Sequence, residues 1–232
     1  MERSEAEAVL PPEVLARIPQ TTLCSSALGL AWQTVQRPVF NHSIRVFFAA
    51  QWLAEKEGSE WAQPDNLPLL FVACVCHDLG TSDNFNGPQR FEVEGADAAQ
   101  HHCQSHGISE QDSRKVWTAI AVHTSPGIAE RIDPFSRLVR YGVMMDFSLA
   151  VRAEVGADDL FVELEKTLPR LDIERVLADA VVNQANEVET SSQRTDNKSW
   201  FSTHKFPIAS WPGILLRARL QNPDHVGRNP AF

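Results

Sequence analysis

The sequence has no apolar stretch of the roughly 20 residues that a membrane-spanning helix needs, and it has no run of basic residues. Its formal net charge is −9, from 21 Lys and Arg residues against 30 Asp and Glu residues. Nucleic-acid binding depends on Lys and Arg side chains that neutralise phosphates, so this balance argues against it. We therefore expect neither a membrane nor a nucleic acid as a partner.

Cysteine is scarce, and its spacing is not that of a zinc or redox motif. Of the four cysteines, Cys74 and Cys76 lie two positions apart in an apolar run, a C-x-C and not a C-x-x-C pattern. We expect both to be buried thiols. Residues 1–14 are acidic and lack the apolar segment of a signal peptide. These features favour a reduced, cytoplasmic compartment.

The sequence also lacks internal repeats and any segment in which apolar and polar residues alternate with period two. Apolar residues instead recur at steps of three and four, which predicts helices over residues 40–56, 67–79, 91–105, 109–123, 133–146 and 172–189. A shorter helix is expected between residues 150 and 170. The residues after 190 are richer in Ser, Asn and Pro, and we expect a mostly irregular arm packed by Trp200, Phe201, Trp211 and Leu215. The prediction is an all-α bundle.

Polar residues lie at the ends of these predicted helices. His42 is in the first turn of the 40–56 helix, His77 and Asp78 end the next one, and His123 and Asp146 end two later ones. Antiparallel helices bring such ends together. Adjacent residues within a helix point about 100° apart, but at a terminus the backbone bends and both residues of the pair can reach one ion. The pattern predicts a divalent metal site, suited to Zn²⁺, Fe²⁺ or Mn²⁺.

Each of these residues also has a purely structural interpretation. A His-Asp pair is common at a helix C-terminus, His42 would be an N-terminal hydrogen-bonding residue, and Asp146 would be the N-cap of a further helix. The ordered set of all four residues favours the metal.

The set H…HD…D, carried by "NHSIRV", "CHDLG" and "MMDF" in helical context, resembles the HD-domain superfamily of metal-dependent hydrolases. The resemblance covers roughly residues 38–147. It implies an all-α HD-domain helical bundle in which His42, His77, Asp78 and Asp146 hold the metal. We expect a single domain over residues 1–232, with a metal-binding core at about 38–147 and a C-terminal helix and arm at about 150–232.

Two further segments narrow the resemblance. "HDLGTSDNF" followed by "RFEVEGADAA", together with "AIAVHTSPGIA", is similar to the cyanamide hydratase branch of the superfamily. That similarity implies a hydratase, a lyase that adds water to a nitrile and converts cyanamide to urea at a single zinc ion. The expected partner is a small-molecule substrate.

Nitrile hydration needs a group that carries a proton to the substrate nitrogen. His123 is the first candidate and Glu92 is the second. The residues expected to orient the substrate or to close its pocket are Thr81, Asp83, Asn84, Phe91, Phe85 and Met145. The alternatives are that His123 caps its helix, that Glu92 only interacts with the helix dipole, and that Asp83 forms an Asx turn.

One metal ion is expected, and not two. Dinuclear oxygenases of the superfamily typically have a histidine where this sequence has Phe91, and His101 and His102 are interpreted as a solvated helix surface. The rival functions are a phosphohydrolase, for which Arg45 would be the best phosphate ligand, an oxygenase, and a sensor without catalysis. A homodimer is a further expectation, from the many apolar residues beyond the motifs.

Overall fold

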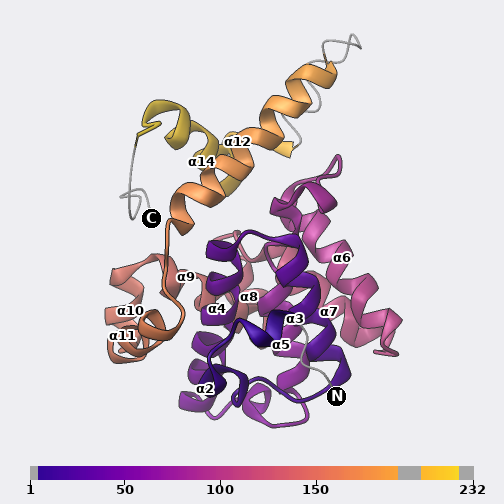
Figure 1. Cartoon of the computed structure of the whole chain (residues 1–232), viewed down its shortest axis with the longest axis vertical. Helices are drawn as coiled ribbons and strands as arrows, with labels where there is room; N and C mark the ends of the chain where they lie inside the picture. The colour runs from indigo at the N-terminus through magenta and orange to yellow at the C-terminus, as the bar shows by residue number, and fades with distance from the viewer. Residues whose placement is uncertain (1–4, 193–204, 225–232) are drawn as a thin grey trace.

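The computed structural model describes residues 5–192 and 205–224. Within them every regular element is a helix, and there is no strand. The all-α prediction is confirmed (Figure 1). The first helices are α1 (Glu5–Ala8), α2 (Pro12–Leu15), α3 (Thr22–Thr34), α4 (Arg37–Lys56), α5 (Leu67–Cys76), α6 (Phe91–Ser105) and α7 (Glu110–Val122). They are followed by α8 (Ala129–Ile132), α9 (Pro134–Phe147), α10 (Leu149–Val155), α11 (Asp158–Thr167), α12 (Ile173–Ser192) and α14 (Trp211–Gln221). Short 3₁₀ turns are η1 (Glu60–Ala62), η2 (Leu79–Thr81) and η3 (Asp83–Phe85).

The centre of the molecule is a bundle in which α4 packs against α5 and α9, and α6 packs against α7. Helix α5 is apolar on every side and is buried from Leu70 to Cys76, as expected for a central helix. Helix α4 is buried over most of its length, from Val39 to Ala50. His42 is on α4, and His77 and Asp78 directly follow α5, so all three residues lie deep in the bundle.

Two glycines allow helices to approach closely. A methyl group at Gly142 on α9 would lie 2.7 Å from the backbone oxygen of Val46 on α4. A methyl group at Gly80 on η2 would overlap the backbone oxygen of Phe91 on α6. Both positions therefore require glycine because of space and not because of backbone angles.

Local capping explains where several helices begin. The Ser109 hydroxyl accepts a hydrogen bond from Asp112 N at 3.0 Å, and Asp133 Oδ1 accepts one from Ser136 N at 2.8 Å, as the sequence predicted for both helix starts. Helix α4 begins at Arg37, three residues before the predicted start at Phe40, because Pro38 is tolerated in a first turn. The prediction that His42 lies in the first turn is therefore wrong, because it lies in the second.

The two ends of the chain differ most from the sequence predictions. Helix α3 was not predicted, although the Thr21 side chain caps it. Two helices, α10 and α11, occupy the region where one was expected. Part of the predicted irregular arm is the helix α14, which the Ser210 side chain caps. Trp200 and Phe201 lie outside the described residues.

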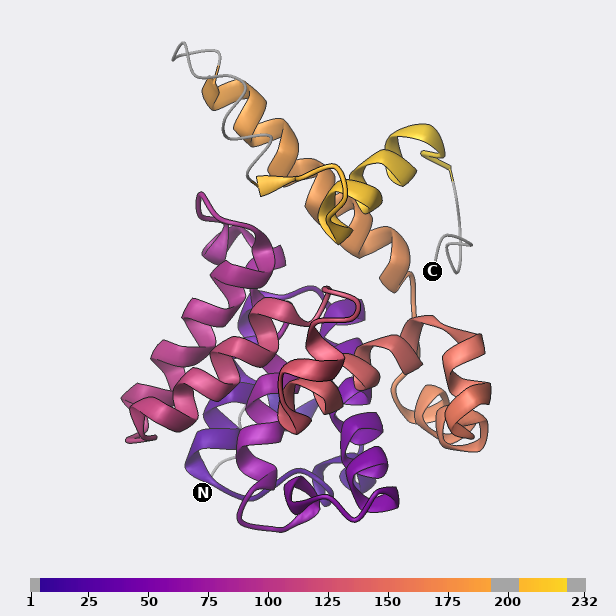
Figure 2. The ribbon, with the colours of Figure 1, turned by 180° about the vertical axis from the view of Figure 1, so that it is seen from behind.

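Helices α12 and α14 lie side by side at one end of the molecule, and we call them the C-terminal helix pair (Figures 1 and 2). They have a small apolar cluster of their own, separate from that of the bundle, and its buried members are Val39, Ile173, Leu177, Ala178, Val181, Phe206 and Leu215. One of these residues, Val39, belongs to α4, so the pair is anchored on the helix that carries His42.

Two further expectations concern the whole described chain. None of its helices combines the length and apolarity that crossing a membrane requires. The thiols of Cys74 and Cys76 are buried and free, as predicted, and burial raises the pKa of both.

Candidate metal centre

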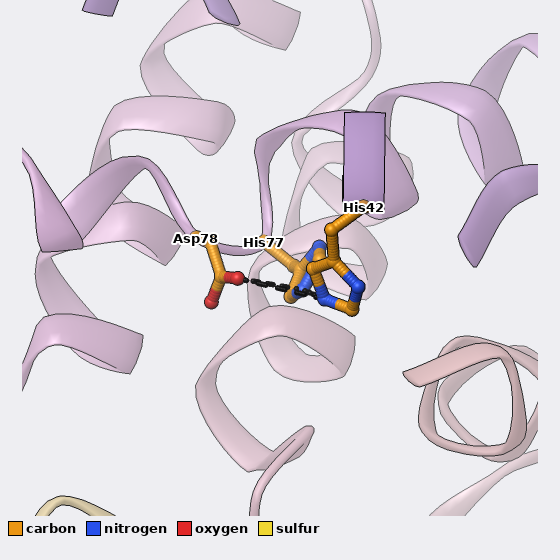
Figure 3. A group of neighbouring side chains, drawn as sticks. All are labelled: His42, His77 and Asp78. Atoms are coloured by element: carbon orange, nitrogen blue, oxygen red, sulfur yellow. Dashed lines mark hydrogen bonds and ion pairs between the residues drawn. The ribbon is translucent and has the colours of Figure 1, made fainter. Parts of the chain in front are cut away.

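His42, His77 and Asp78 converge at the centre of the bundle, and their side chains point toward one another (Figure 3). His42 Nε2 lies 3.1 Å from His77 Nε2 and 3.7 Å from Asp78 Oδ2, and His77 Nε2 lies 3.2 Å from the same oxygen. His77 is the C-cap of α5, and Asp78 leaves the helical conformation with φ −105° and ψ 11°. The bend at the helix end brings the two adjacent side chains to one point, as the sequence predicted.

The hydrogen bonds on the far side of the rings determine which nitrogens carry protons. His77 Nδ1 lies 2.7 Å from the backbone oxygen of Cys74, and His42 Nδ1 lies 2.6 Å from Asp146 Oδ2. Oxygens of this kind only accept, so Nδ1 donates in both rings. In neutral rings each Nε2 then has a lone pair, and the two lone pairs face each other without a hydrogen between them. A cation between them removes this conflict.

Acid–base behaviour points to the same need for one positive charge. Burial lowers the pKa of His42. Burial opposes protonation of His77 as well, but the adjacent Asp78 carboxylate outweighs it and raises the pKa of His77. Burial would raise the pKa of Asp78, yet the neighbouring imidazoles bring it far below its usual range. The cluster is thus built around an ionised carboxylate and one cationic charge, which a divalent ion provides.

The residues present fit such an ion. Zinc binds imidazole nitrogen at about 2.0–2.1 Å, so two nitrogens on one ion lie no more than about 4.2 Å apart, and the observed 3.1 Å is within this limit. Two imidazoles and one carboxylate also leave positions for water, which is the pattern of catalytic and not of structural sites. Among the described residues, this is the one group with metal-ligand geometry.

A family model described as "HD domain" matches residues 39–180. The chain belongs to the HD-domain family. Members of this family are metal-dependent enzymes of the hydrolase type, and the cluster His42, His77 and Asp78 contains its His-Asp pair. The match extends beyond the predicted core, which ended at about residue 147. A search of curated proteins found no match.

Asp146 lies behind His42 in this HD domain. Besides accepting from His42, its carboxylate is bound by Arg45, with Nε 2.8 Å from Oδ1 and Nη2 2.7 Å from Oδ2. Burial would raise the pKa of Asp146, but Arg45 and His42 hold it well below its usual range. In this arrangement Asp146 orients His42. Its predicted role as a direct metal ligand stays a prediction.

The position of Arg45 rules out one of its predicted roles. The guanidinium is fully buried, and in addition to Asp146 it donates to the backbone oxygen of Leu168 at 2.9 Å. The prediction that Arg45 is the best ligand for a phosphate was therefore wrong, because its donors face the protein interior.

His123 lies beside the cluster at the end of α7. Its Nε2 is 3.7 Å from Asp78 Oδ1, and its ring meets that of His77 edge-on with centroids 4.9 Å apart. Its Nδ1 donates to the backbone oxygen of Ile120 at 2.6 Å, so the ring also caps its own helix. Burial, together with the charge of His77, lowers the pKa of His123 to about 3. Its Nε2 is therefore a free acceptor at neutral pH.

A cavity of about 220 Å³ opens next to these residues. Its polar side is formed by His42, His77, Asp78 and His123. The apolar part of the lining is a surface that we call the apolar wall, formed by Val143, Met144, Phe147, Val151, Leu177 and Trp211. Phe147 of this wall packs against the His42 ring, with centroids 4.8 Å apart. The remaining lining residues are Thr124, Arg140 and Ser148. Sequence reasoning did not single out Thr124 or Ser148, although Thr124 directly follows His123.

The other predicted catalytic residue, Glu92, is fully buried and is not part of the cavity lining. It accepts a hydrogen bond from the Thr124 hydroxyl at 2.5 Å and forms an ion pair with Arg90 at 2.5 Å. Glu92 therefore contacts the cavity through Thr124, and its catalytic role stays a prediction.

None of the predicted substrate-binding residues, including Thr81 and Phe91, is among the residues that line the cavity, and their role stays a prediction. Thr81 is buried, and its hydroxyl donates to the backbone oxygen of Asp78 at 2.7 Å, which stabilises the turn after the metal pair. Phe91 is buried with its ring 5.8 Å from both His123 and Trp211. Asp83 and Asn84 are exposed on η3 and, like Phe85 and Met145, are not among the residues that line the cavity.

Of the two adjacent histidines on α6, only His101 is exposed. His102 is buried, and its Nε2 donates to the backbone oxygen of Leu23 at 3.2 Å. The prediction of a solvated surface was wrong for His102 because α3, which was not predicted, covers that face of α6.

Proposed function

We propose that this HD domain is a hydratase that adds water to the carbon of a small nitrile, with cyanamide as the first candidate substrate. The observation that supports it most is the cluster of His42, His77 and Asp78 beside a small cavity whose remaining lining is mostly apolar. The similarity of "HDLGTSDNF" and "AIAVHTSPGIA" to cyanamide hydratases supports the reaction. The proposed cofactor is one divalent ion, zinc first, with Fe²⁺ or Mn²⁺ as alternatives.

The chain's own residues would divide the work as follows. His42 and His77 hold the ion through Nε2, and Asp78 holds it through its carboxylate. A bound divalent ion supplies a water of lowered pKa at neutral pH. In the overall reaction one water is added, so that its oxygen bonds to the nitrile carbon and both of its protons end on the nitrogen. His123 Nε2 is a free acceptor 3.7 Å from Asp78 Oδ1, and it is placed to carry a proton from the added water to the substrate nitrogen.

A phosphohydrolase is less well supported. A phosphate ester needs cationic donors near the metal, and Arg45 is turned away from it. The cavity contains Arg140, but this side chain forms an ion pair with Glu130 at 3.1 Å and donates to the backbone oxygen of His123 at 3.0 Å. A homodimer and a cytoplasmic location stay predictions.

The most direct test measures metal content and turnover on one preparation. We expect about one divalent ion per chain and hydration of cyanamide or another small nitrile. The comparison substrates are small phosphate esters. Two tightly bound ions per chain would contradict the mononuclear centre, and turnover of esters without turnover of nitriles would favour the phosphohydrolase.

His123→Gln tests the proton carrier. If His123 moves a proton, the variant should keep its metal while turnover falls by roughly 10²–10⁴-fold. If His123 is a ligand, metal and turnover should be lost together. If it only caps α7, turnover should fall by less than about threefold while the melting temperature decreases. Metal content, turnover and melting temperature on this one variant distinguish the three roles.

A further inference from the structure

We propose that the C-terminal helix pair selects the substrate through Leu177 and Trp211, and that the preferred substrate is an uncharged nitrile with a short apolar substituent. This inference rests on the proposed function and concerns the same cavity. The cavity lining has a polar part and an apolar part. The side with the metal-ligating residues is polar, whereas the apolar wall offers only carbon and the Met144 thioether, apart from the Trp211 indole nitrogen.

Each polar group at the edge of the cavity already has at least one partner within the protein. The Thr124 hydroxyl donates to Glu92, and the Ser148 hydroxyl caps α10 by accepting from Val151 N at 3.3 Å. Arg140 bonds to Glu130 and to the backbone oxygen of His123. A charged substituent on the substrate would lose its hydration without gaining an opposite charge on the apolar wall, which is costly. An apolar substituent would instead gain from leaving water.

The size of the cavity leads to the same substrate class. At about 220 Å³ it has space on the order of seven water-sized groups, taking ~30 Å³ for each. Cyanamide has only three heavy atoms, so with one water it would leave much of the space along the apolar wall empty. A nitrile with a short alkyl substituent would fill that space.

The part of the wall that comes from the C-terminal helix pair is held in place from several sides. Gln184 Nε2 donates to the backbone oxygen of Gly80 at 2.7 Å, close to the metal pair. Leu177 is 2% exposed, within the small cluster of the pair. The Trp211 ring packs against Phe91, whose ring also contacts His123. The wall is thus preorganised against the catalytic side of the cavity.

Trp211 also lies outside residues 39–180, the segment that matches the family model. The metal-ligating residues belong to the matched segment, while the apolar wall is partly supplied by a segment beyond it. Because the metal-ligating residues and part of the apolar wall come from different segments, the residues of the wall can change while the metal ligands stay the same.

The test uses alkyl hydroxamates, which chelate a divalent ion whatever reaction the enzyme catalyses. Affinities of the metal-loaded protein are measured by calorimetry for acetohydroxamate and its longer straight-chain homologues, and for benzohydroxamate. In the wild type we expect affinity to rise roughly fourfold for each added CH₂ until the cavity is full, which is the fold-change that corresponds to ~0.8 kcal/mol. Benzohydroxamate should bind more weakly than the best alkyl member.

Trp211→Ala should shift this size preference. Benzohydroxamate should bind at least tenfold more tightly than to the wild type, while the affinity for acetohydroxamate and the metal content change by less than about threefold. Trp211→Phe should give an intermediate shift and serves if the alanine variant does not fold. Leu220→Ala is the matched control, because Leu220 is on the same helix but is 65% exposed and does not line the cavity.

Wild-type affinities that do not depend on chain length would overturn the inference, as would a Trp211 variant that weakens all hydroxamates equally. The outcome is separable from that of the proposed function. If no nitrile is hydrated but the chain-length dependence and its shift are seen, the selective role of the apolar wall is supported and the nitrile reaction is contradicted. If nitriles are hydrated but the hydroxamate affinities do not depend on chain length, the reaction is supported and the selective role of the apolar wall is contradicted.

Discussion

The bundle and the C-terminal helix pair both contribute residues to one cavity, but they are built very differently. The bundle surrounds its polar centre with fully buried aromatic side chains such as Phe40, Phe47 and Phe71. The pair relies on the short cluster around Leu177 and Leu215 and on a few polar contacts such as Gln184 to Gly80. Metal ligands must keep their positions to within fractions of an ångström, whereas an apolar wall that selects a substrate by size tolerates larger displacements.

The two regions should therefore differ in local stability. Opening of a structural element costs little when few buried apolar contacts hold it. The pair has a small cluster, and the bundle has one that extends from Ala6 to Leu168. The pair should open before the bundle unfolds, so changes in the two regions should have separable effects.

The largest effect is expected at the metal centre. Asp78→Ala removes the one carboxylate of the described cluster, so metal affinity should fall by much more than tenfold and turnover should be lost. Metal analysis and turnover are measured together. Asp159→Ala is the control because Asp159 is exposed on α11, and it should retain both properties. Full turnover with unchanged metal in the Asp78 variant would mean that the His-Asp pair is only structural.

The next largest effect should come from the charges beneath that centre. Arg45→Met removes the bidentate partner of the buried Asp146 carboxylate and leaves Arg170, 3.1 Å from Oδ1, as its nearest guanidinium, so the free energy of unfolding should fall by about 3 kcal/mol. Arg137→Met removes a partly exposed ion pair with Glu57, and its cost should stay below about 1 kcal/mol. Urea unfolding of the metal-free proteins measures both. Equal decreases in the free energy of unfolding for the Arg45 and Arg137 variants would contradict a special role for the buried ion pair.

A third pair of variants compares the two regions directly. Leu70→Ala in α5 should cost about 2–5 kcal/mol in global stability, because Leu70 is fully buried in the bundle. Leu215→Ala in α14 should move the global unfolding midpoint much less and should instead speed amide hydrogen exchange in α14. If Leu215→Ala destabilises the whole protein as much as Leu70→Ala does, the pair and the bundle unfold as one unit.

The smallest effect is expected at the edge of the bundle. His102→Ala removes the hydrogen bond to the backbone oxygen of Leu23, which ties α6 to α3, and should cost about 1 kcal/mol. The adjacent His101→Ala, on the exposed side of α6, should cost nothing measurable in a thermal melt. Identical melting temperatures for the two variants would show that this bond adds no stability.

Helix positions were predictable where local signals agree. Ser109 and Asp133 cap α7 and α9 through bonds that span three residues, so the sequence contains the whole signal. Helix α14 was missed because Gly213 has a low helix propensity, and the formation of α14 depends on packing Leu215 against α12.

The sequence by itself determined the helical class and the convergence of the adjacent His77 and Asp78, because apolar periodicity and the bend at the end of α5 are local properties. The approach of His42 to this pair depends on the packing of α4 against α5. Only the tertiary structure decided that Asp146 turns toward His42 and Arg45, and that His123 faces Asp78. It also decided that Trp211 faces the cavity. The direction of a side chain at a helix end depends on which charges and rings approach it from distant helices, and no local pattern contains that information.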